Sequence, residues 1–245
     1  MRFFPLLALL LLYSASSKAG IEEGKIAYNL GDYETAYFEF YRLAKLGDPE
    51  AQCFLGDFYR KGNSVEKNEQ EAFEWYRKAA GQGDARAQYH LGVSYSQGVL
   101  VGKDYDEAAK WYYKAAMQGY VEAQSNLGAM FYLGQGVGRS EVDALKWFRK
   151  AAVQGDAGAQ YNLGAMYLSG SGVDKDEVEA VKWFRKAAEL GLVEAQYKLG
   201  TMYFLGQGIN TDYVEATKWM QKAADQGNAQ AEHVIELIKK TEILE

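Results

Sequence analysis

The chain has 245 residues, of which 48% are hydrophobic and 24% charged, and its formal net charge is −6. This composition is typical of a folded protein and argues against disorder, while an acidic balance without a basic cluster argues against a nucleic-acid partner. Two prolines and 26 glycines predict many short helices joined by glycine turns.

Residues 1–19 have the pattern of an export signal. Arg2 provides a positive start, residues 3–13 are almost wholly apolar, and Ser17 and Ala19 are the small residues that precede a cleavage site. The apolar run is too short to cross a bilayer, which needs about 20 residues. We predict a signal peptide over 1–19, cleaved after Ala19, and no membrane span after cleavage. An uncleaved anchor is the alternative interpretation.

Residues 20–47 predict a degenerate N-terminal helix pair, the first helix from Glu22 to Leu30 and the second from Asp32 to Leu46. Residues 48–227 then repeat with a period of 36 residues. The period relates five tryptophans, five Ala-Gln pairs, five Leu-Gly pairs and five Lys-Ala-Ala runs: Trp75, Trp111, Trp147, Trp183 and Trp219; Ala51, Ala87, Ala123, Ala159 and Ala195; Leu55, Leu91, Leu127, Leu163 and Leu199; Lys78, Lys114, Lys150, Lys186 and Lys222. Such a period is typical of a stacked-repeat protein, whose usual function is binding.

Each repeat predicts two helices. In the first copy Asp48 and Pro49 open one helix, and Gly62 closes it. Asn68, followed by Glu71, gives the pattern of a capping box for the second helix. Gly56 lies mid-helix, where we expect it to admit the second helix through Ala72 and Ala79. The tryptophans are expected to fill the space between neighbouring pairs. Residues 228–245 predict one capping helix, in which Glu236 replaces the mid-helix glycine.

The repeat pattern resembles a known family. One copy reads Ala159-Gln160-Tyr161-Asn162-Leu163-Gly164, then Gly170-Ser171-Gly172-Val173, then Ala180-Val181-Lys182-Trp183-Phe184-Arg185-Lys186-Ala187-Ala188. This is similar to the Sel1-like repeat, a longer-looped relative of the tetratricopeptide repeat. The resemblance implies an all-α, right-handed α/α superhelical solenoid of 36-residue helix-turn-helix repeats, with a concave face formed mainly by first helices. Family members are mostly adaptors and regulators, many of them in the bacterial envelope or secreted. A cysteine-rich branch is linked to β-lactam binding, but Cys53 is the only cysteine here.

Three patterns suggest chemistry, and each has a simpler interpretation. Ser64 and Lys67 match S-x-x-K without its companion motifs. The glycines around Gln135 and Gln207 follow no predicted strand, so turns explain them better than phosphate loops. His90 and His233 are far apart in sequence and lack the further ligands of a metal site. We therefore predict no catalytic residue, no metal and no cofactor, and a protein that is not an enzyme.

Alignment with the tetratricopeptide pattern points two columns of residues into the groove. One is Cys53, Tyr89, Ser125, Tyr161 and Tyr197, and the other is Arg60, Ser96, Tyr132, Leu168 and Phe204. Tyrosine and apolar side chains suit a protein-binding surface. The predicted partner-binding residues are Tyr89, Tyr132, Tyr161, Leu168, Tyr197 and Phe204. For any single tyrosine, a purely structural role remains open.

The resulting hypothesis is an exported adaptor or regulator, periplasmic or secreted and most consistent with a bacterial envelope. It would hold a peptide or domain of a partner protein in its groove. Two alternatives remain: an enzyme acting on cell-wall or β-lactam substrates, and a secreted factor that engages a host protein.

Overall fold

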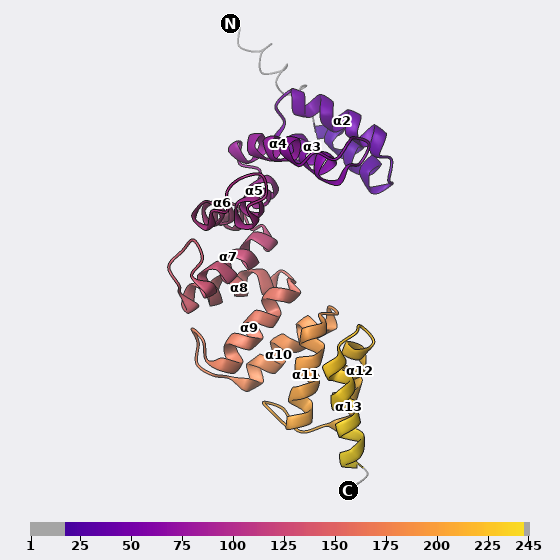
Figure 1. The fold of residues 1–245 in the computed structure, drawn as a ribbon, viewed down its shortest axis with the longest axis vertical. Helices are drawn as coiled ribbons and strands as arrows, with labels where there is room; N and C mark the ends of the chain where they lie inside the picture. Colours follow the sequence, from indigo (N-terminus) through magenta and orange to yellow (C-terminus); the bar gives the residue numbers. More distant parts are fainter. Residues whose placement is uncertain (1–17, 243–245) are drawn as a thin grey trace, which may run out of the picture. The chain divides into compact units, whose positions relative to one another are not determined.

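The computed structural model describes residues 18–242, and within that range every regular element is a helix (Figure 1). The helices are short and of similar length. After a helix over 18–29 they are α2 (Tyr33–Lys45), α3 (Pro49–Lys61), α4 (Glu69–Gly81), α5 (Ala85–Gln97), α6 (Tyr105–Met117), α7 (Val121–Leu133), α8 (Glu141–Val153), α9 (Ala157–Ser169), α10 (Glu177–Glu189), α11 (Val193–Leu205), α12 (Tyr213–Ala224) and α13 (Ala229–Glu242). The predicted all-α fold of paired helices with a 36-residue repeat is confirmed.

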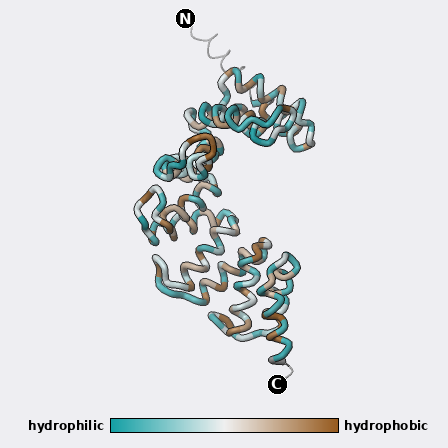
Figure 2. Tube along the Cα trace, in the orientation of Figure 1, coloured by the Kyte–Doolittle hydropathy of each residue, from teal (hydrophilic) through white to brown (hydrophobic). Residues whose placement is uncertain are grey.

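The chain forms two compact units, each described here by itself. The first unit extends to Tyr120 and contains α2 to α6; the second begins at Val121 and contains α7 to α13. Within each unit, every odd-numbered helix packs on the even-numbered helix that follows it, and each such pair packs on the next. In Figure 2 hydrophobic and hydrophilic residues intermingle along the helices of both units, as expected where each helix has one buried and one exposed face.

The ends of the first helices follow the expected capping chemistry. The side chain of Asp48 accepts a hydrogen bond from the backbone N–H of Ala51, and Asp84 and Asp156 do the same in later copies. Each of these helices ends at a glycine in the left-handed conformation, as at Gly62 (φ 78°). Because only glycine adopts this conformation without steric cost, it fixes where the chain turns toward the second helix.

The second helices begin with half of the predicted capping box. The Asn68 side chain accepts from the backbone N–H of Glu71, as predicted. The backbone N–H of Asn68, which the box assigns to the glutamate, instead donates to the carbonyl of Tyr59 at 2.9 Å. The same bond recurs at Asp104, Ser140, Asp176 and Asp212. It ties the start of each second helix to the first helix of its own repeat, which leaves the glutamate free to pair with a lysine, as Glu179 does with Lys182.

In the first four repeats the mid-helix glycine makes room for an aromatic ring, and in the fifth repeat Gly200 faces Met220. A Cβ atom built on Gly56 would lie 2.5 Å from the ring of Tyr76, and one on Gly128 would lie 2.8 Å from Phe148. The expected close approach of the second helix is therefore real. The nearest contact, however, is the residue that follows the tryptophan rather than Ala72 or Ala79. This contact offsets the intrinsic cost of glycine inside a helix, roughly 1 kcal/mol.

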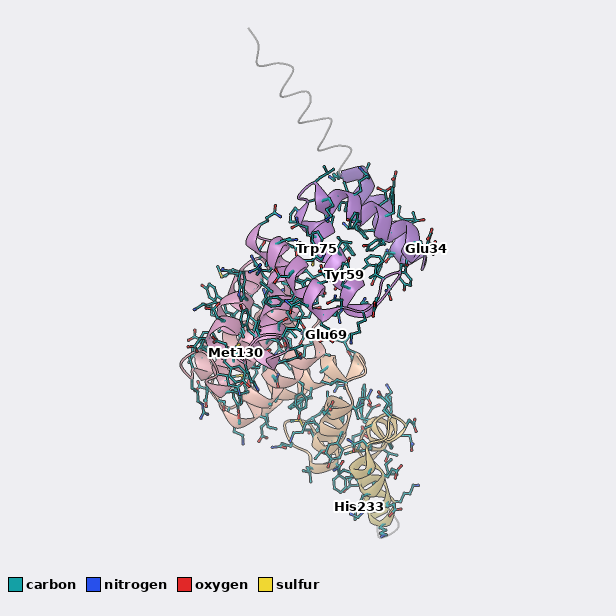
Figure 3. All side chains as sticks on the ribbon, turned by 45° about the horizontal axis from the view of Figure 1, so that its top comes forward. Glu34, Tyr59, Glu69, Trp75, Met130 and His233 are labelled. Atoms are coloured by element: carbon teal, nitrogen blue, oxygen red, sulfur yellow. The ribbon has the colours of Figure 1, made fainter. Side chains whose placement is uncertain are left out.

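The tryptophans are packed among the helices and partly covered by lysine. Trp147 is only 4% exposed, and Trp75 (labelled in Figure 3) is also buried. The Nζ atom of Lys150 lies 4.2 Å from the centre of the Trp147 ring, and the same geometry recurs in all five copies. The first lysine of each Lys-Ala-Ala run thus makes a cation–π contact one helical turn after its tryptophan.

Buried glutamines link successive helix ends. Gln52 donates to the carbonyl of Ala44 at the end of α2, and its side-chain oxygen accepts from Gln82 after α4 at 2.8 Å. Gln88 and Gln118 repeat the arrangement in the next copy. The Ala-Gln motif therefore has a structural role, because the buried glutamine adds a side-chain hydrogen bond to a carbonyl at the end of the preceding helix.

The ends of the array differ from its interior. Near the N-terminus Phe40 stacks on Phe54 at 4.1 Å, and near the C-terminus α13 packs on α12 through Ala231, Ile235 and Ile238. Glu236 is exposed on α13.

Most of the predicted export signal lies outside the described residues. The predicted cleavage point after Ala19 falls inside the helix over 18–29.

Candidate binding pockets

The six predicted groove residues are divided between the two units. Tyr89 belongs to the first unit, and the other five belong to the second. Tyr161 packs against Phe184 with ring centres 5.3 Å apart, and Leu168, Tyr197 and Phe204 lie half-buried against core clusters. Tyr132 is 38% exposed. Tyr89 and Tyr132 each line a cavity within their own unit.

A cavity in the second unit, here called the apolar pocket, lies among α7, α8 and α9. Its volume is about 270 Å³, and its lining consists of Ala129, Tyr132, Leu133, Phe148, Asn162, Ala165 and Met166. Asn162 is the one amide in an otherwise aromatic and aliphatic wall. Leu133, next to Tyr132 in the chain, is 59% exposed. A cavity of this size accommodates an apolar side chain of a partner rather than a large cofactor.

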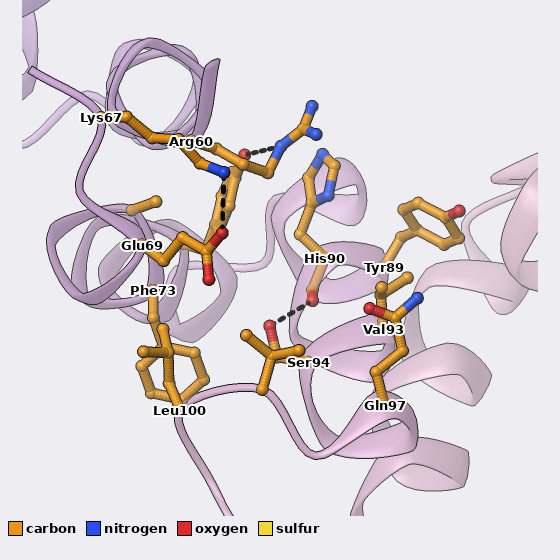
Figure 4. Close-up of a pocket in the computed structure, with 13 residues that line it drawn as sticks. Arg60, Lys67, Glu69, Phe73, Tyr89, His90, Val93, Ser94, Gln97 and Leu100 are labelled. Carbon is orange, nitrogen blue, oxygen red and sulfur yellow. Dashed lines mark hydrogen bonds and ion pairs between the residues drawn. The ribbon is translucent and has the colours of Figure 1, made fainter. Parts of the chain in front are cut away.

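A cavity in the first unit, here called the polar pocket, has a larger volume than the apolar pocket, about 500 Å³. It lies among α3, α4, α5 and the loop after α5 (Figure 4). Its polar lining includes Arg60, Lys67, Glu69, Tyr76, Tyr89, His90, Ser94 and Gln97, and its apolar lining includes Phe73, Val93, Val99 and Leu100. Lys67 pairs with Glu69 at 3.0 Å. This pairing engages the lysine of the S-x-x-K match, and Ser64 lies in the turn before it.

The two pockets occupy the same place in the repeat, two copies apart. Arg60 corresponds to Tyr132, Tyr76 to Phe148, His90 to Asn162, Val93 to Ala165 and Ser94 to Met166. One architectural position therefore carries charged and hydrogen-bonding groups in the first unit and apolar groups in the second. Sequence reasoning singled out the Arg60 and Tyr89 columns but missed the Tyr76 and His90 columns. The signal for these two was the change of residue type at a fixed repeat position.

A buried carboxylate organises the polar pocket. Asp57 is 6% exposed; it accepts a hydrogen bond from the Tyr76 hydroxyl at 2.7 Å and pairs with Arg86 at 3.0 Å. Arg86 also donates to the Cys53 thiol, and burial raises the pKa of that thiol well above its usual range. Tyr76 donates to one carboxylate oxygen of Asp57 and Arg86 forms an ion pair with the other, so the charge of Asp57 is compensated within the protein.

His90 lies beside this carboxylate as a neutral ring. Its imidazole stacks on Tyr76 at 4.4 Å, and its Nε2 atom is 3.6 Å from Asp57 Oδ1. Burial lowers the pKa of His90 to about 4; Asp57 opposes the shift, whereas Arg60, Arg86 and Lys61 add to it. At neutral pH the histidine therefore contributes a polar, uncharged group to the pocket wall.

The repeats match a family model. A model of the Sel1 repeat aligns with residues 49–84, 85–120, 121–156, 157–192 and 193–228. The chain belongs to the Sel1 repeat family. Its five Sel1 repeats contain both pockets: the polar pocket lies between the first and second repeats, and the apolar pocket between the third and fourth.

Two solved Sel1 repeat structures are similar over most of the chain. The crystal structure of c5321, a protective antigen present in uropathogenic Escherichia coli, is 34% identical with a TM-score of 0.85 over 97% of this chain. This chain spans only 52% of that one. A Sel1 repeat protein from Oxalobacter formigenes is 38% identical with a TM-score of 0.81, over 88% of this chain and 86% of its own.

More distant similarity shows the fold alone. The immunity protein Pa5087 from Pseudomonas aeruginosa is 20% identical with a TM-score of 0.53, over 86% of this chain and 81% of that one. A search among functionally curated proteins finds no match. Among residues 18–242 no group of three or more His, Cys, Asp or Glu side chains is placed to hold a metal ion. No helix in that range is long and apolar enough to cross a bilayer.

Proposed function

We propose that this Sel1 repeat protein is a non-enzymatic, exported adaptor or regulator that binds a segment of a partner protein at its inter-repeat pockets. The observation that carries the proposal is the exposure of Tyr132 and Leu133 beside the apolar pocket. The repeat provides a rigid wall for this pocket, because Phe148 is fixed against Gly128. Preformed apolar concavities edged by aromatic side chains are typical of partner-binding sites.

The energetics favour a multipoint contact. Burying one apolar side chain in the apolar pocket contributes about 1.5–3 kcal/mol. Association and ordering costs consume several kcal/mol, so one anchor alone gives weak binding. We therefore propose that a partner inserts one apolar side chain here and contacts neighbouring first helices as well. On this proposal the half-buried Tyr161, Leu168, Tyr197 and Phe204 contribute their exposed edges rather than whole side chains.

Export is part of the proposal, with the periplasm or the exterior of a bacterium as the destination. The positive, apolar and small residues of 1–19 support it. The related Escherichia coli protein is described as a protective antigen. A protein recognised as an antigen fits a destination outside the cytoplasm.

A site-specific crosslinking experiment tests the binding site. A photoreactive amino acid replaces Leu133 beside the apolar pocket; the matched control replaces Val153, which is 68% exposed at the end of α8. In the native cells we expect one discrete crosslinked protein from position 133 and none from position 153. The partner is then purified, and its affinity for the Tyr132→Ser and Val153→Ser variants is measured by calorimetry. Serine is chosen at position 132 because Ser96 occupies the equivalent position of the preceding repeat.

The proposal predicts at least about tenfold weaker binding for Tyr132→Ser, corresponding to the loss of one buried side chain. Val153→Ser should bind as the wild type does. Equal crosslinking from both positions, or unchanged affinity after Tyr132→Ser, would mean that the partner uses another surface.

A further inference from the structure

The charges of the polar pocket are not needed to build a Sel1 repeat. At the position of Asp57 the later repeats carry Val93, Ala129, Ala165 and Thr201, and at the position of Arg60 they carry Ser96, Tyr132, Leu168 and Phe204. The same helices form without these charges. A buried ion pair contributes little net stability compared with apolar packing at the same place. The first repeat therefore retains a charged arrangement that its own fold does not require.

The charged arrangement fixes the orientation of the Arg60 guanidinium. Its Nε atom donates to the Tyr76 hydroxyl at 3.2 Å, and its Nη2 atom is 3.6 Å from Asp57, beyond hydrogen-bond length. Asp57 is already engaged by Tyr76 and Arg86 at shorter distances. Tyr76 thus holds the Nε edge of the guanidinium, while the Arg60 side chain as a whole remains 47% exposed. Figure 4 shows Arg60 and His90 side by side at the same wall.

The charges around Arg60 indicate which kind of ligand would suit the pocket. Lys67 adds a second cation, and its pairing with Glu69 is exposed, so this pairing is weak and exchangeable. His90 is neutral, and the negative charge of Asp57 is compensated by Arg86. The pocket therefore presents no uncompensated negative charge next to Arg60. An arginine with one free edge of its planar fork is suited to a carboxylate, which it binds through two parallel hydrogen bonds.

The mouth of the pocket adds an apolar requirement. Val99 and Leu100 are 40% and 46% exposed and line the cavity together with Phe73. Leu100 has φ +67°, a left-handed conformation; the equivalent positions of later repeats carry glycine, as at Gly172 and Gly208. A leucine in this conformation has a steric cost that glycine avoids. The second repeat thus places a bulky apolar side chain at the mouth despite the steric cost.

We propose that the polar pocket selects an acidic side chain of a partner peptide, with Arg60 pairing its carboxylate and an adjacent apolar residue lying against Phe73, Val99 and Leu100. This inference rests on the proposed adaptor function and specifies the chemistry of one anchor. Tyr76 and Asp57 are positioning residues, because they act through Arg60. The equivalent apolar pocket selects an apolar side chain, so the two pockets read different residues.

The probe is a random library of twelve-residue peptides displayed on phage, selected on the full chain. The best peptide is then synthesised in two forms, with its glutamate or aspartate kept or replaced by the corresponding amide. Both forms are titrated calorimetrically into the wild type, Arg60→Ser, Tyr76→Phe and, as a control in the other pocket, Tyr132→Ser. The substitutions at 60, 76 and 132 introduce residue types that other repeats carry at the same positions, which favours correct folding.

We expect selected peptides to be enriched in an acidic residue next to an apolar one. We also expect the wild type and Tyr132→Ser to bind the acidic form about tenfold more tightly than the amide, as for a charge-assisted pair. Arg60→Ser should abolish that preference and Tyr76→Phe should reduce it. An acid–amide preference that is absent in the wild type, or that survives in Arg60→Ser, refutes the inference but leaves the adaptor function standing. Failure to enrich any peptide contradicts both.

Discussion

Leu190 occupies the position from which Gln154, one repeat earlier, donates to Gln124 at 2.8 Å. The side-chain oxygen of Gln160, the counterpart of Gln124, is consequently buried without a hydrogen-bond partner among the described residues. Gln82, Gln118 and Gln226 complete the same pairing in the other copies. The fourth repeat therefore contains a single local defect in an otherwise regular chain of glutamines.

Restoring the missing glutamine should stabilise the protein. Leu190→Gln provides a donor for Gln160 and removes a leucine that is 58% exposed. We expect the free energy of unfolding to rise by about 1 kcal/mol, the usual net value of one hydrogen bond. The urea midpoint at constant slope measures it. The mirror variant Gln154→Leu should lose a similar amount, and opposite signs for the two variants are the specific signature.

Trp147→Ala should be strongly destabilising. The ring is buried within the second unit, so truncation should cost about 3–5 kcal/mol. Because repeats are stabilised by their neighbours, the loss should also broaden the unfolding transition. Lys150→Met removes only the cation–π partner and should cost less than about 1 kcal/mol. Denaturation curves of the three proteins give the comparison, and a Trp147→Ala curve that overlays the wild type would exclude a core role.

Gly172→Ala should be destabilising for two separate reasons. Gly172 has φ +69°, and an added Cβ would lie 2.6 Å from the backbone of Glu141. We expect a loss of more than about 1 kcal/mol, the cost of the left-handed conformation alone. Gly138 is the matched control, since a Cβ there meets no atom within 4 Å. Thermal unfolding of both variants provides the measurement, and equal melting temperatures would show that the loop moves away freely.

His90 should make stability depend on pH. Its pKa is about 4 when folded and about 6.5 in an unfolded chain, so the unfolded state binds the proton first as pH falls. The free energy of unfolding should therefore decrease between about pH 6.5 and 4, by up to roughly 3 kcal/mol. His90→Asn, which copies Asn126 and Asn162, lacks this term. The difference between the two proteins isolates it from other titrating groups, and parallel pH curves would disprove the burial of a neutral ring.

The export proposal predicts the N-terminus of the mature protein. Intact-mass measurement of protein isolated from the native cells should give a chain that begins at Gly20, because Ser17 and Ala19 are the small residues before the predicted cleavage site. Replacing Ala19 with a bulky residue should shift or block the processing. A cytoplasmic protein that retains Met1 would contradict the proposal.

Most of the fold could be predicted from the sequence because it depends on local chemistry repeated five times. Asp48, Asn68 and Gly62 cap their helices as their residue types predict. Contacts between helices were less predictable. The ring over Gly56 comes from Tyr76 rather than from the expected alanines, because the direction of a long side chain depends on how the two helices cross.

The candidate site was predicted only in part for the same reason. Tyr132 is exposed as expected, whereas Leu168, in the same column, packs against a core cluster formed mainly by the fourth and fifth repeats. Identical repeat positions therefore differ in exposure, which periodicity alone does not reveal. The polar pocket depends on Asp57, Tyr76 and Arg86, which come from three different helices. Their meeting point becomes visible only when the repeats are packed together.

The residue above the mid-helix glycine also distinguishes the first repeats of the array from the third. Tyr76 gives its hydroxyl to Asp57, and the Tyr112 hydroxyl lies 3.2 Å from Ser96, whereas Phe148 has no hydroxyl. Exchanging the first and third second helices would remove the hydrogen bond that Asp57 accepts from Tyr76 and would bury a phenol against Ala129. The repeats look interchangeable in their backbone. Their order nevertheless matters, because the ring hydroxyl is present only in the repeats whose first helix offers it a polar partner.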